Sequence, residues 1–265
     1  WCSAAFQNYP DYLERKWKTC KNRLLEASEY PLARQAEGIL NTSKNAVCKG
    51  VAEMKLNVLN LGRCDYKKAL DIQYDILEKR QKDELGDTLI LVEHPPVITL
   101  GRHGAESNIV VPEQYLKNNG IDVYHIERGG DVTYHGYGQI VGYPIVSLRN
   151  NKIGIREFVE KLENTFISLL KEQYGIDSGI NPDFPGVWVG NNKITALGLA
   201  VKRGVTMHGF AFNVNTNLEH FNLILPCGIS GKGVTSLEKL TGSKIDFNHA
   251  NKTVVDYFCK TFGYE

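Results

Sequence analysis

Apolar and polar positions follow strand or helix spacing through most of the chain after residue 53. Met54–Leu61 alternates in part between the two kinds and predicts a strand. After Asp65, a residue type that caps helices, apolar residues recur at i, i+3, i+4, i+8 and i+11, with one polar break at i+7, which predicts a helix to about Lys82. A second helical stripe starts at Ile155 and ends near Gly175.

Short apolar runs bounded by Gly or Pro predict further strands. They are Thr88–Glu93, Val97–Leu100, Ile121–Ile126, Ile140–Val146 and Val205–Val214. Val187–Gly198 is typical of a hairpin with its turn at residues 190–192, and short helices are expected at Val234–Leu240 and Thr253–Phe262. Strands joined by hairpins and interrupted by unequal helices predict an α+β fold, with a mixed, largely antiparallel sheet flanked by helices.

Residues 1–53 show only a ragged apolar pattern, with few Gly, Pro or alternating runs. We therefore expect two parts, an N-terminal extension of unknown role at 1–53 and a domain at 54–265 that carries the chemistry. Because the candidate motifs all lie after residue 53, the extension is expected to be dispensable for activity.

Charge and cysteine usage narrow the class of protein. The chain has 265 residues, 42% hydrophobic and 23% charged, and its 31 basic and 30 acidic residues give a formal net charge of +1. This balance does not favour a nucleic-acid partner, and no apolar run is long enough to predict a membrane span. Six scattered cysteines form no C-x-x-C pair, so we expect no structural metal site, no disulfide framework and a cytoplasmic, reducing location.

The segment Arg128–Gln139 holds four glycines in twelve residues, with Arg, Asp and His among them. Glycine allows a left-handed backbone or close approach of a ligand, so the segment predicts a loop between two strands against which a ligand lies. It matches neither G-x-G-x-x-G nor the P-loop pattern, so the usual nucleotide fingerprints are absent. A second glycine-bounded loop, Gly101–Gly104, fits a plain turn as well as a site.

Two residues fit nucleophilic chemistry, although each also has an ordinary structural explanation. Cys227 lies between Pro226 and Gly228 at a sharp corner, a suitable place for a nucleophile, but a lone cysteine is more often a small buried hydrophobe. Lys193 follows the hairpin turn and by default would be a solvated lysine. Simple alternation puts Lys193 on the face of Thr195 and Leu197, where a pocket would allow it to act as a base.

Four motifs, at 128–139, 193–198, 208–213 and 226–229, closely resemble in order and spacing those of the lipoyl(octanoyl) transferases. The resemblance runs from about Met54 to the C-terminus and implies the fold shared by biotin protein ligases and lipoate ligases. It implies that the acyl group is carried as a thioester on Cys227 and that Lys193 adjusts the reactivity of the Cys227 thiol. The implied substrate contacts are Arg128, Gly129, Gly130, Asp131, Val132, Thr133, Tyr134, His135, Ala196, Leu197, Gly198, Gly209, Phe210 and Ala211. Tyr137 departs from the family pattern, which usually has Pro there.

The resemblance also implies the reaction and its partners. An octanoyl (or lipoyl) group would pass from octanoyl-acyl carrier protein to a lysine of lipoyl domains, the first step of endogenous lipoate synthesis. Acceptors would be the 2-oxoacid dehydrogenase complexes and the glycine-cleavage carrier protein. Because the donor is already a thioester, no ATP, metal or other cofactor is expected. Two alternatives remain open, an ATP-dependent lipoate–protein ligase and a non-catalytic acyl- or lipoyl-domain-binding protein.

Overall fold

The computed structural model of the chain describes residues 54–225 and 232–265. The predicted extension at 1–53 and the Cys227 motif lie outside these residues. The extent of the domain therefore stays a prediction.

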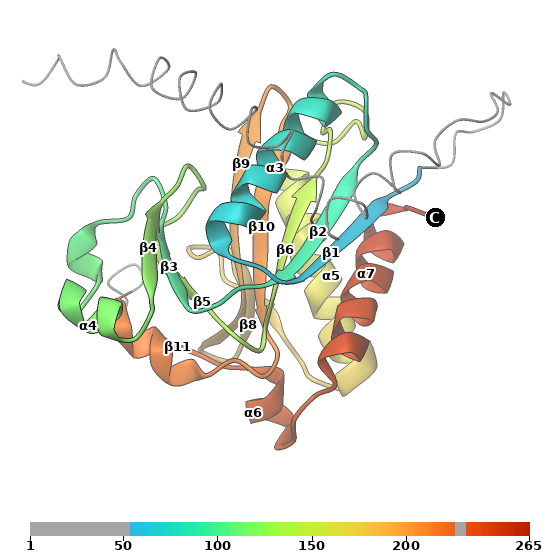
Figure 1. Cartoon of the computed structure of the whole chain (residues 1–265). Helices are drawn as coiled ribbons and strands as arrows, with labels where there is room; N and C mark the ends of the chain where they lie inside the picture. Colours follow the sequence, from blue (N-terminus) through green and yellow to red (C-terminus); the bar gives the residue numbers. More distant parts are fainter. Residues whose placement is uncertain (1–53, 226–231) are drawn as a thin grey trace, which may run out of the picture. The chain divides into compact units, whose positions relative to one another are not determined.

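A mixed main sheet forms the centre of the described part, in the order β1-β2-β6-β10-β9-β8-β7, with β11 beside β9 (Figure 1). Its strands are β1 (Asn57–Arg63), β2 (Thr88–Glu93), β6 (Gln139–Ile145), β7 (Gly179–Ile180), β8 (Gly186–Val189), β9 (Asn192–Lys202), β10 (Val205–Asn213) and β11 (Gly233–Val234). β1 runs parallel to β2 and β11 parallel to β9, while the other neighbours are antiparallel.

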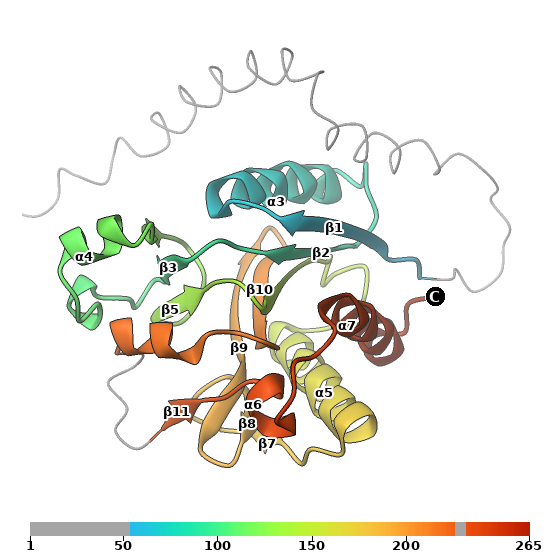
Figure 2. The same cartoon turned by 60° about the horizontal axis from the view of Figure 1, so that its bottom comes forward.

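Helices cover both faces of this sheet (Figure 2). They are α3 (Tyr66–Gln81), α5 (Ile155–Tyr174), α6 (Leu237–Thr241) and α7 (Phe247–Phe262). One apolar cluster joins α5 and α7 to the sheet through side chains such as Phe166 and Phe212. A second cluster, which includes Ala69 and Met207, joins α3 to the opposite face. The sheet is thus buried on both sides, which accounts for the nearly continuous apolar sequence of β2, β6 and β10.

A small second sheet has the order β4-β3-β5. Its strands are β3 (Val97–Leu100), β4 (Asp122–His125) and β5 (Val132–His135), with α4 (Glu113–Asn118) between β3 and β4. Short 3₁₀ segments lie at Glu106–Asn108 (η1) and Leu218–Leu223 (η2). Ile98 and Tyr134 pack with η2 residues in a separate small core, which holds η2 against the small sheet.

The predicted α+β class, the mixed sheet and the two long helices are confirmed. α3 begins after Asp65, although that side chain makes no capping hydrogen bond. Several boundaries were wrong. Arg128–Gln139 is not one loop, because Val132–His135 pairs with β3. α7 starts at Phe247, where the Asp246 side chain accepts a hydrogen bond from the His249 backbone N–H, and α6 starts only after Ser236.

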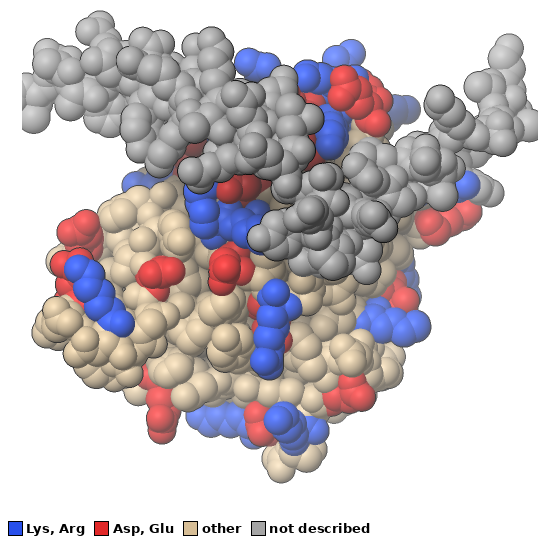
Figure 3. Space-filling model, in the orientation of Figure 1, with Lys and Arg blue, Asp and Glu red and all other residues tan. Residues whose placement is uncertain are grey.

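Charged side chains of both signs are interspersed over the part of the surface seen in Figure 3 that grey atoms leave visible. Among the described helices, none is long and apolar enough to cross a membrane. Within residues 54–225 and 232–265, no group of three or more His, Cys, Asp or Glu side chains is placed to hold a metal ion.

Candidate active site

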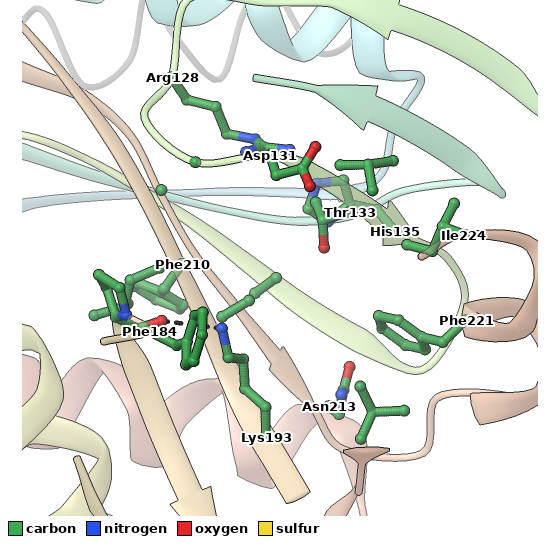
Figure 4. Close-up of a pocket in the computed structure, with 18 of the residues that line it drawn as sticks. Arg128, Asp131, Thr133, His135, Phe184, Lys193, Phe210, Asn213, Phe221 and Ile224 are labelled. Carbon is green, nitrogen blue, oxygen red and sulfur yellow. Dashed lines mark hydrogen bonds between the residues drawn. The ribbon is translucent and has the colours of Figure 1, made fainter. Parts of the chain in front are cut away.

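A cavity of about 1100 Å³ opens between the small sheet, β9 and β10. Figure 4 shows Arg128, Asp131 and Thr133 on one side of it, with Lys193 and Phe184 on the other. The predicted substrate contacts from the three described motifs line this cavity, with the exception of Tyr134. Segments that are far apart in the sequence are therefore brought to one place by the sheet order.

The loop at residues 128–131 closes one side of the cavity. Its Gly129 N–H donates to the Leu199 carbonyl at 2.8 Å, which attaches the loop to the edge of β9. Behind it, the Gly101 N–H donates to the Asp131 carbonyl at 3.1 Å. A Cβ on Gly101 would come within 2.4 Å of the Gly130 carbonyl oxygen, so glycine is required there by close approach.

The charged side chains of this loop are held by neighbouring polar groups. Arg128 is 8% exposed, and its guanidinium donates to the Thr99 carbonyl at 2.7 Å and to the Thr99 hydroxyl at 3.0 Å. Both carboxylate oxygens of Asp131 accept from the Asn108 side-chain amide at 2.8 Å. The loop at 101–104, which sequence left open between turn and site, supports the first loop, and His103 lines the cavity.

Lys193 lies at the opposite side of the cavity, but the face predicted for it was wrong. Val187 pairs with Thr195 and Trp188 with Lys193, so Ile194 is an extra residue in β9. Such a bulge interrupts the alternation of side chains. As a result, Ile194 and Leu197, predicted to face opposite sides, pack against the same core cluster.

The Lys193 ammonium group has defined neighbours. Its Nζ donates to the Pro185 carbonyl at 3.1 Å and lies 4.8 Å from the centroid of the Trp188 ring. Lys232 is a second cation here, with Nζ at 5.1 Å from the Trp188 ring centroid and 4.4 Å from that of Phe184. Two lysines from distant parts of the chain thus share one aromatic side chain at the cavity.

β5 sends alternate side chains in opposite directions. Thr133 and His135 line the cavity, whereas Tyr134 is buried in the core of the small sheet. The Tyr134 hydroxyl is 2.6 Å from His220 Nδ1, a contact that holds η2 against β5. Tyr134 therefore supports the cavity wall from behind.

Glycines let β10 and β6 approach closely beside the cavity. A Cβ on Gly209 would lie 2.2 Å from the Gly142 carbonyl oxygen, and one on Gly142 would lie 2.0 Å from the Phe210 ring. Phe210 lies against Phe166 of α5, with ring centroids 4.8 Å apart. Ala196, Leu197, Gly198 and Ala211 complete this part of the lining.

A wall of polar aromatic side chains lies on the α3 side of the cavity. Its lining members are Tyr66, His135, Tyr143 and His208, and His94 stands behind Tyr143. Burial lowers the pKa of His94 to about 4. Burial, followed by the charge of neighbouring imidazoles and Arg128, lowers the pKa of His135 to about 3. Burial and Arg128 do the same for His208, whose pKa is about 3, so the wall is uncharged at neutral pH.

The turn at residues 136–138 shows what Tyr137 does in place of Pro. Tyr137 is 47% exposed, and the Arg63 guanidinium lies 4.7 Å from its ring centroid. Arg63 also pairs with Glu93 at 2.8 Å, and Glu93 accepts from the Gly138 N–H at 2.9 Å. The turn is therefore fixed by an ion pair and a stacked cation, and Tyr137 does not line the cavity.

Cys227 lies outside the described residues, but both neighbours of its segment are described. Leu225 and Lys232, which precede and follow residues 226–231, line the cavity. Sequence reasoning missed several lining residues, including Tyr66, Tyr143, Phe184, Trp188 and Lys232. Apolar periodicity alone assigns Tyr66 and Tyr143 to the core, so only the motifs that contain His135 and His208 gave a signal for the polar wall.

Residues 65–259 match the profile of the lipoyl protein ligase A/B catalytic domain. An octanoyltransferase of Alkaliphilus metalliredigens is 59% identical over 212 residues, which cover 80% of this chain and 97% of that protein. An octanoyltransferase of Desulforamulus reducens is 54% identical over 212 residues, covering 80% of this chain and 93% of that protein.

Solved structures share the fold at much lower identity. A lipoate-protein ligase A bound with ATP is similar with a TM-score of 0.65 at 18% identity, covering 80% of this chain and 87% of that one. A bipartite lipoate protein ligase from Thermoplasma acidophilum has a TM-score of 0.64 at 18% identity, covering 80% of this chain and 85% of that one.

Proposed function

Because the chain belongs to the lipoyl protein ligase A/B catalytic domain family and is an octanoyltransferase, we propose that it transfers the acyl group through a thioester on Cys227. The donor is octanoyl-acyl carrier protein. The acceptor is a lysine of lipoyl domains, including those of 2-oxoacid dehydrogenase complexes and the glycine-cleavage carrier protein. Transfer takes place in the cytoplasm, where reducing conditions keep a thiol free.

One observation carries this proposal. Leu225 and Lys232 both line the cavity at which Lys193 is held. This supports the proposal that the intervening segment, which carries Cys227, delivers its thiol to the part of the cavity at which Lys193 is held.

The reaction proceeds in two balanced steps. The Cys227 thiolate attacks the octanoyl carbonyl, and the tetrahedral intermediate collapses with release of the carrier thiolate, which takes a proton from the Lys193 ammonium. The acceptor lysine amine then attacks the acyl-enzyme, forming the amide and returning the Cys227 thiolate. In its neutral form Lys193 accepts the proton of the incoming amine, and as an ammonium ion beside the thiolate it stabilises the charge on sulfur.

Intact-mass spectrometry after incubation with octanoyl-acyl carrier protein tests the intermediate. Wild type should gain one octanoyl group and lose it when a lipoyl domain is added. Cys227→Ser should gain none, because a hydroxyl is far less acidic than a thiol, whereas Cys259→Ser on α7 is the matched control and should still be acylated. An adduct that persists in Cys227→Ser would contradict the assignment.

Lys193 is tested through the pH dependence of iodoacetamide alkylation at Cys227. Lys193→Ala should shift the profile to higher pH, and Lys193→Arg should not restore transfer, because a guanidinium does not release its proton at working pH. An unchanged profile in Lys193→Ala would remove the lysine from the mechanism. Product formed from free octanoate, ATP and magnesium without carrier protein would instead indicate a ligase.

A further inference from the structure

The polar wall on the α3 side of the cavity takes no part in the proposed transfer steps. Tyr66, His135, Tyr143 and His208 are each at most 8% exposed. Polar side chains buried this deeply are normally hydrogen-bonded, and a wall with open positions is costly unless a ligand or water fills them. The neighbours of each group decide whether it can donate or accept a hydrogen bond toward the cavity.

His94 fixes the hydrogen of the Tyr143 hydroxyl. His94 Nδ1 lies 2.7 Å from the Cys64 carbonyl, which can only accept, so Nδ1 carries the proton. The neutral ring then has a lone pair on Nε2, and the Tyr143 hydroxyl donates to it at 2.8 Å. The Tyr143 oxygen keeps its acceptor capacity toward the cavity.

His135 and Tyr66 present complementary groups. His135 Nδ1 donates to the Gln139 side-chain oxygen at 2.8 Å, so the neutral ring leaves Nε2 as an acceptor. The Tyr66 hydroxyl makes no hydrogen bond to any other described residue. The two rings are stacked, with centroids 6.3 Å apart and planes 13° apart. An acceptor nitrogen and a donor hydroxyl thus lie on one wall.

His208 supplies an independent sign that the wall is incomplete. It is 2% exposed, and neither ring nitrogen has a hydrogen-bond partner among the described residues. Its backbone is held in the left-handed region, with φ of +55°, by a hydrogen bond from its N–H to the Gln73 side chain at 3.0 Å. A buried, unpartnered imidazole in a strained backbone is typical of a site that receives a ligand.

The wall lies across the main sheet from Lys193. Gln139 of β6 pairs with Asn213 of β10, and Phe212 pairs with Thr195, so Gln139 is level with Ile194, the residue next to Lys193. Gln139 holds His135, and the His94 ring that contacts the Tyr143 hydroxyl lies 6.1 Å from the His135 ring. Two strand spacings separate Ile194 from Gln139, about 10 Å, and an eight-carbon chain with bonds of about 1.5 Å spans about 9 Å. An acyl chain that runs from Lys193 across β10 to β6 therefore ends at the wall.

We propose that this wall is a subsite for a neutral hydrogen-bonding group at the far end of the acyl chain, and that ω-hydroxyacyl chains are substrates. An ω-hydroxyl would donate to His135 Nε2 and accept from the Tyr66 hydroxyl. A carboxylate can only accept, so it would gain one hydrogen bond from the Tyr66 hydroxyl, would be repelled by the His135 lone pair and would lose most of its hydration. The subsite rests on the proposed function, in which the donor is a thioester.

The test compares octanoyl, 8-hydroxyoctanoyl and 7-carboxyheptanoyl groups on acyl carrier protein, with a lipoyl domain as acceptor. In wild type, kcat/KM for the hydroxylated chain should lie within about tenfold of that for octanoyl, because its hydroxyl is hydrogen-bonded when buried. The carboxylated chain should be at least roughly 100-fold poorer. Tyr66→Phe should lower the ratio of hydroxylated to plain chain by about tenfold.

Tyr124→Phe is the matched control. Its ring lies 5.1 Å from that of Tyr66, but it does not line the cavity, and the ratio should stay at the wild-type value. An unchanged ratio in Tyr66→Phe, or better transfer of the carboxylated chain, would overturn the subsite. If no thioester donor is used, the proposed donor is wrong, and the same three chains compared as free acids with ATP still test the wall.

Discussion

Three buried imidazoles connect the cavity wall to the pH dependence of stability. The pKa values of His94, His135 and His208 in the folded protein, about 4, 3 and 3, lie below the value of about 6.5 for an exposed histidine. The unfolded chain therefore binds more protons at mildly acidic pH. Stability is fully present above pH 6.5 and falls as pH decreases from there toward the folded-state values.

We predict that the free energy of unfolding drops on going from pH 7.5 to pH 5.5, by about 1 kcal/mol for each of these histidines. Urea denaturation at both values measures it. His208→Asn should lower the loss by about one histidine's share, since an amide does not titrate. Equal stability at both values would mean that these rings titrate in the folded protein as they do in the unfolded chain.

At this scale the sequence indicates some lining residues better than others. Arg128, Gly129 and His135 line the cavity as predicted, because glycines and charged groups cluster locally, while their role as substrate contacts stays a prediction. Tyr66 and Tyr143 were not predicted, since each has the spacing of a core residue and only the fold makes them neighbours of His94. Lys193 also lines the cavity, but one inserted residue in β9 changed its face, and such a bulge cannot be read from the sequence pattern.

Among the elements, α3, the end of β6 and the C-terminus meet at Asp87. This carboxylate is 8% exposed and accepts from Arg80 at 2.7 Å, from the Ser147 N–H at 2.9 Å and from the Tyr264 hydroxyl at 2.8 Å. It also accepts from the Asn151 amide at 2.6 Å. One buried charge thus fixes three elements relative to one another.

We predict that Asp87→Asn lowers the free energy of unfolding by about 3 kcal/mol, because it leaves the Arg80 guanidinium without its buried counter-charge. Asp83→Asn is the control. Asp83 also pairs with Arg80, but its side chain is 74% exposed, so the loss should stay below about 1 kcal/mol. Urea denaturation measures the free energy of unfolding of both variants. A similar small loss in the two would show that Asp87 does not hold these elements together.

The helices and strands themselves were predicted well, because a long apolar period such as that of α5 remains visible despite local irregularities. The residues at which they start and end were predicted less well where a single side chain decides them. Asp246 caps α7 and adds a turn and a half before the apolar stripe, and β5 exists because β3 offers a partner edge. Neither fact can be read from spacing within the segment itself.

For the whole molecule, the backbone joins the two ends of the described domain. The Glu265 N–H donates to the Met54 carbonyl at 3.0 Å. We predict that a protein comprising 54–265 folds and transfers octanoate at a rate close to that of the full chain. Activity with a lipoyl domain and thermal unfolding measure this.

A protein starting at Asn57 is the comparison for that experiment, since it lacks the Met54 carbonyl and should unfold at a lower temperature. Loss of folding or of transfer in 54–265 itself would show that residues 1–53 contribute to the domain.

The hydrogen bond from Gly129 to Leu199 has a consequence for solubility. β8 pairs with β9 only as far as Ala196, so the following stretch of β9 would present an open strand edge on that side. Open edges recruit strands from other molecules and start aggregation. The loop at residues 128–131 occupies this edge. A change that detaches this loop from β9 would therefore promote self-association as well as impair transfer.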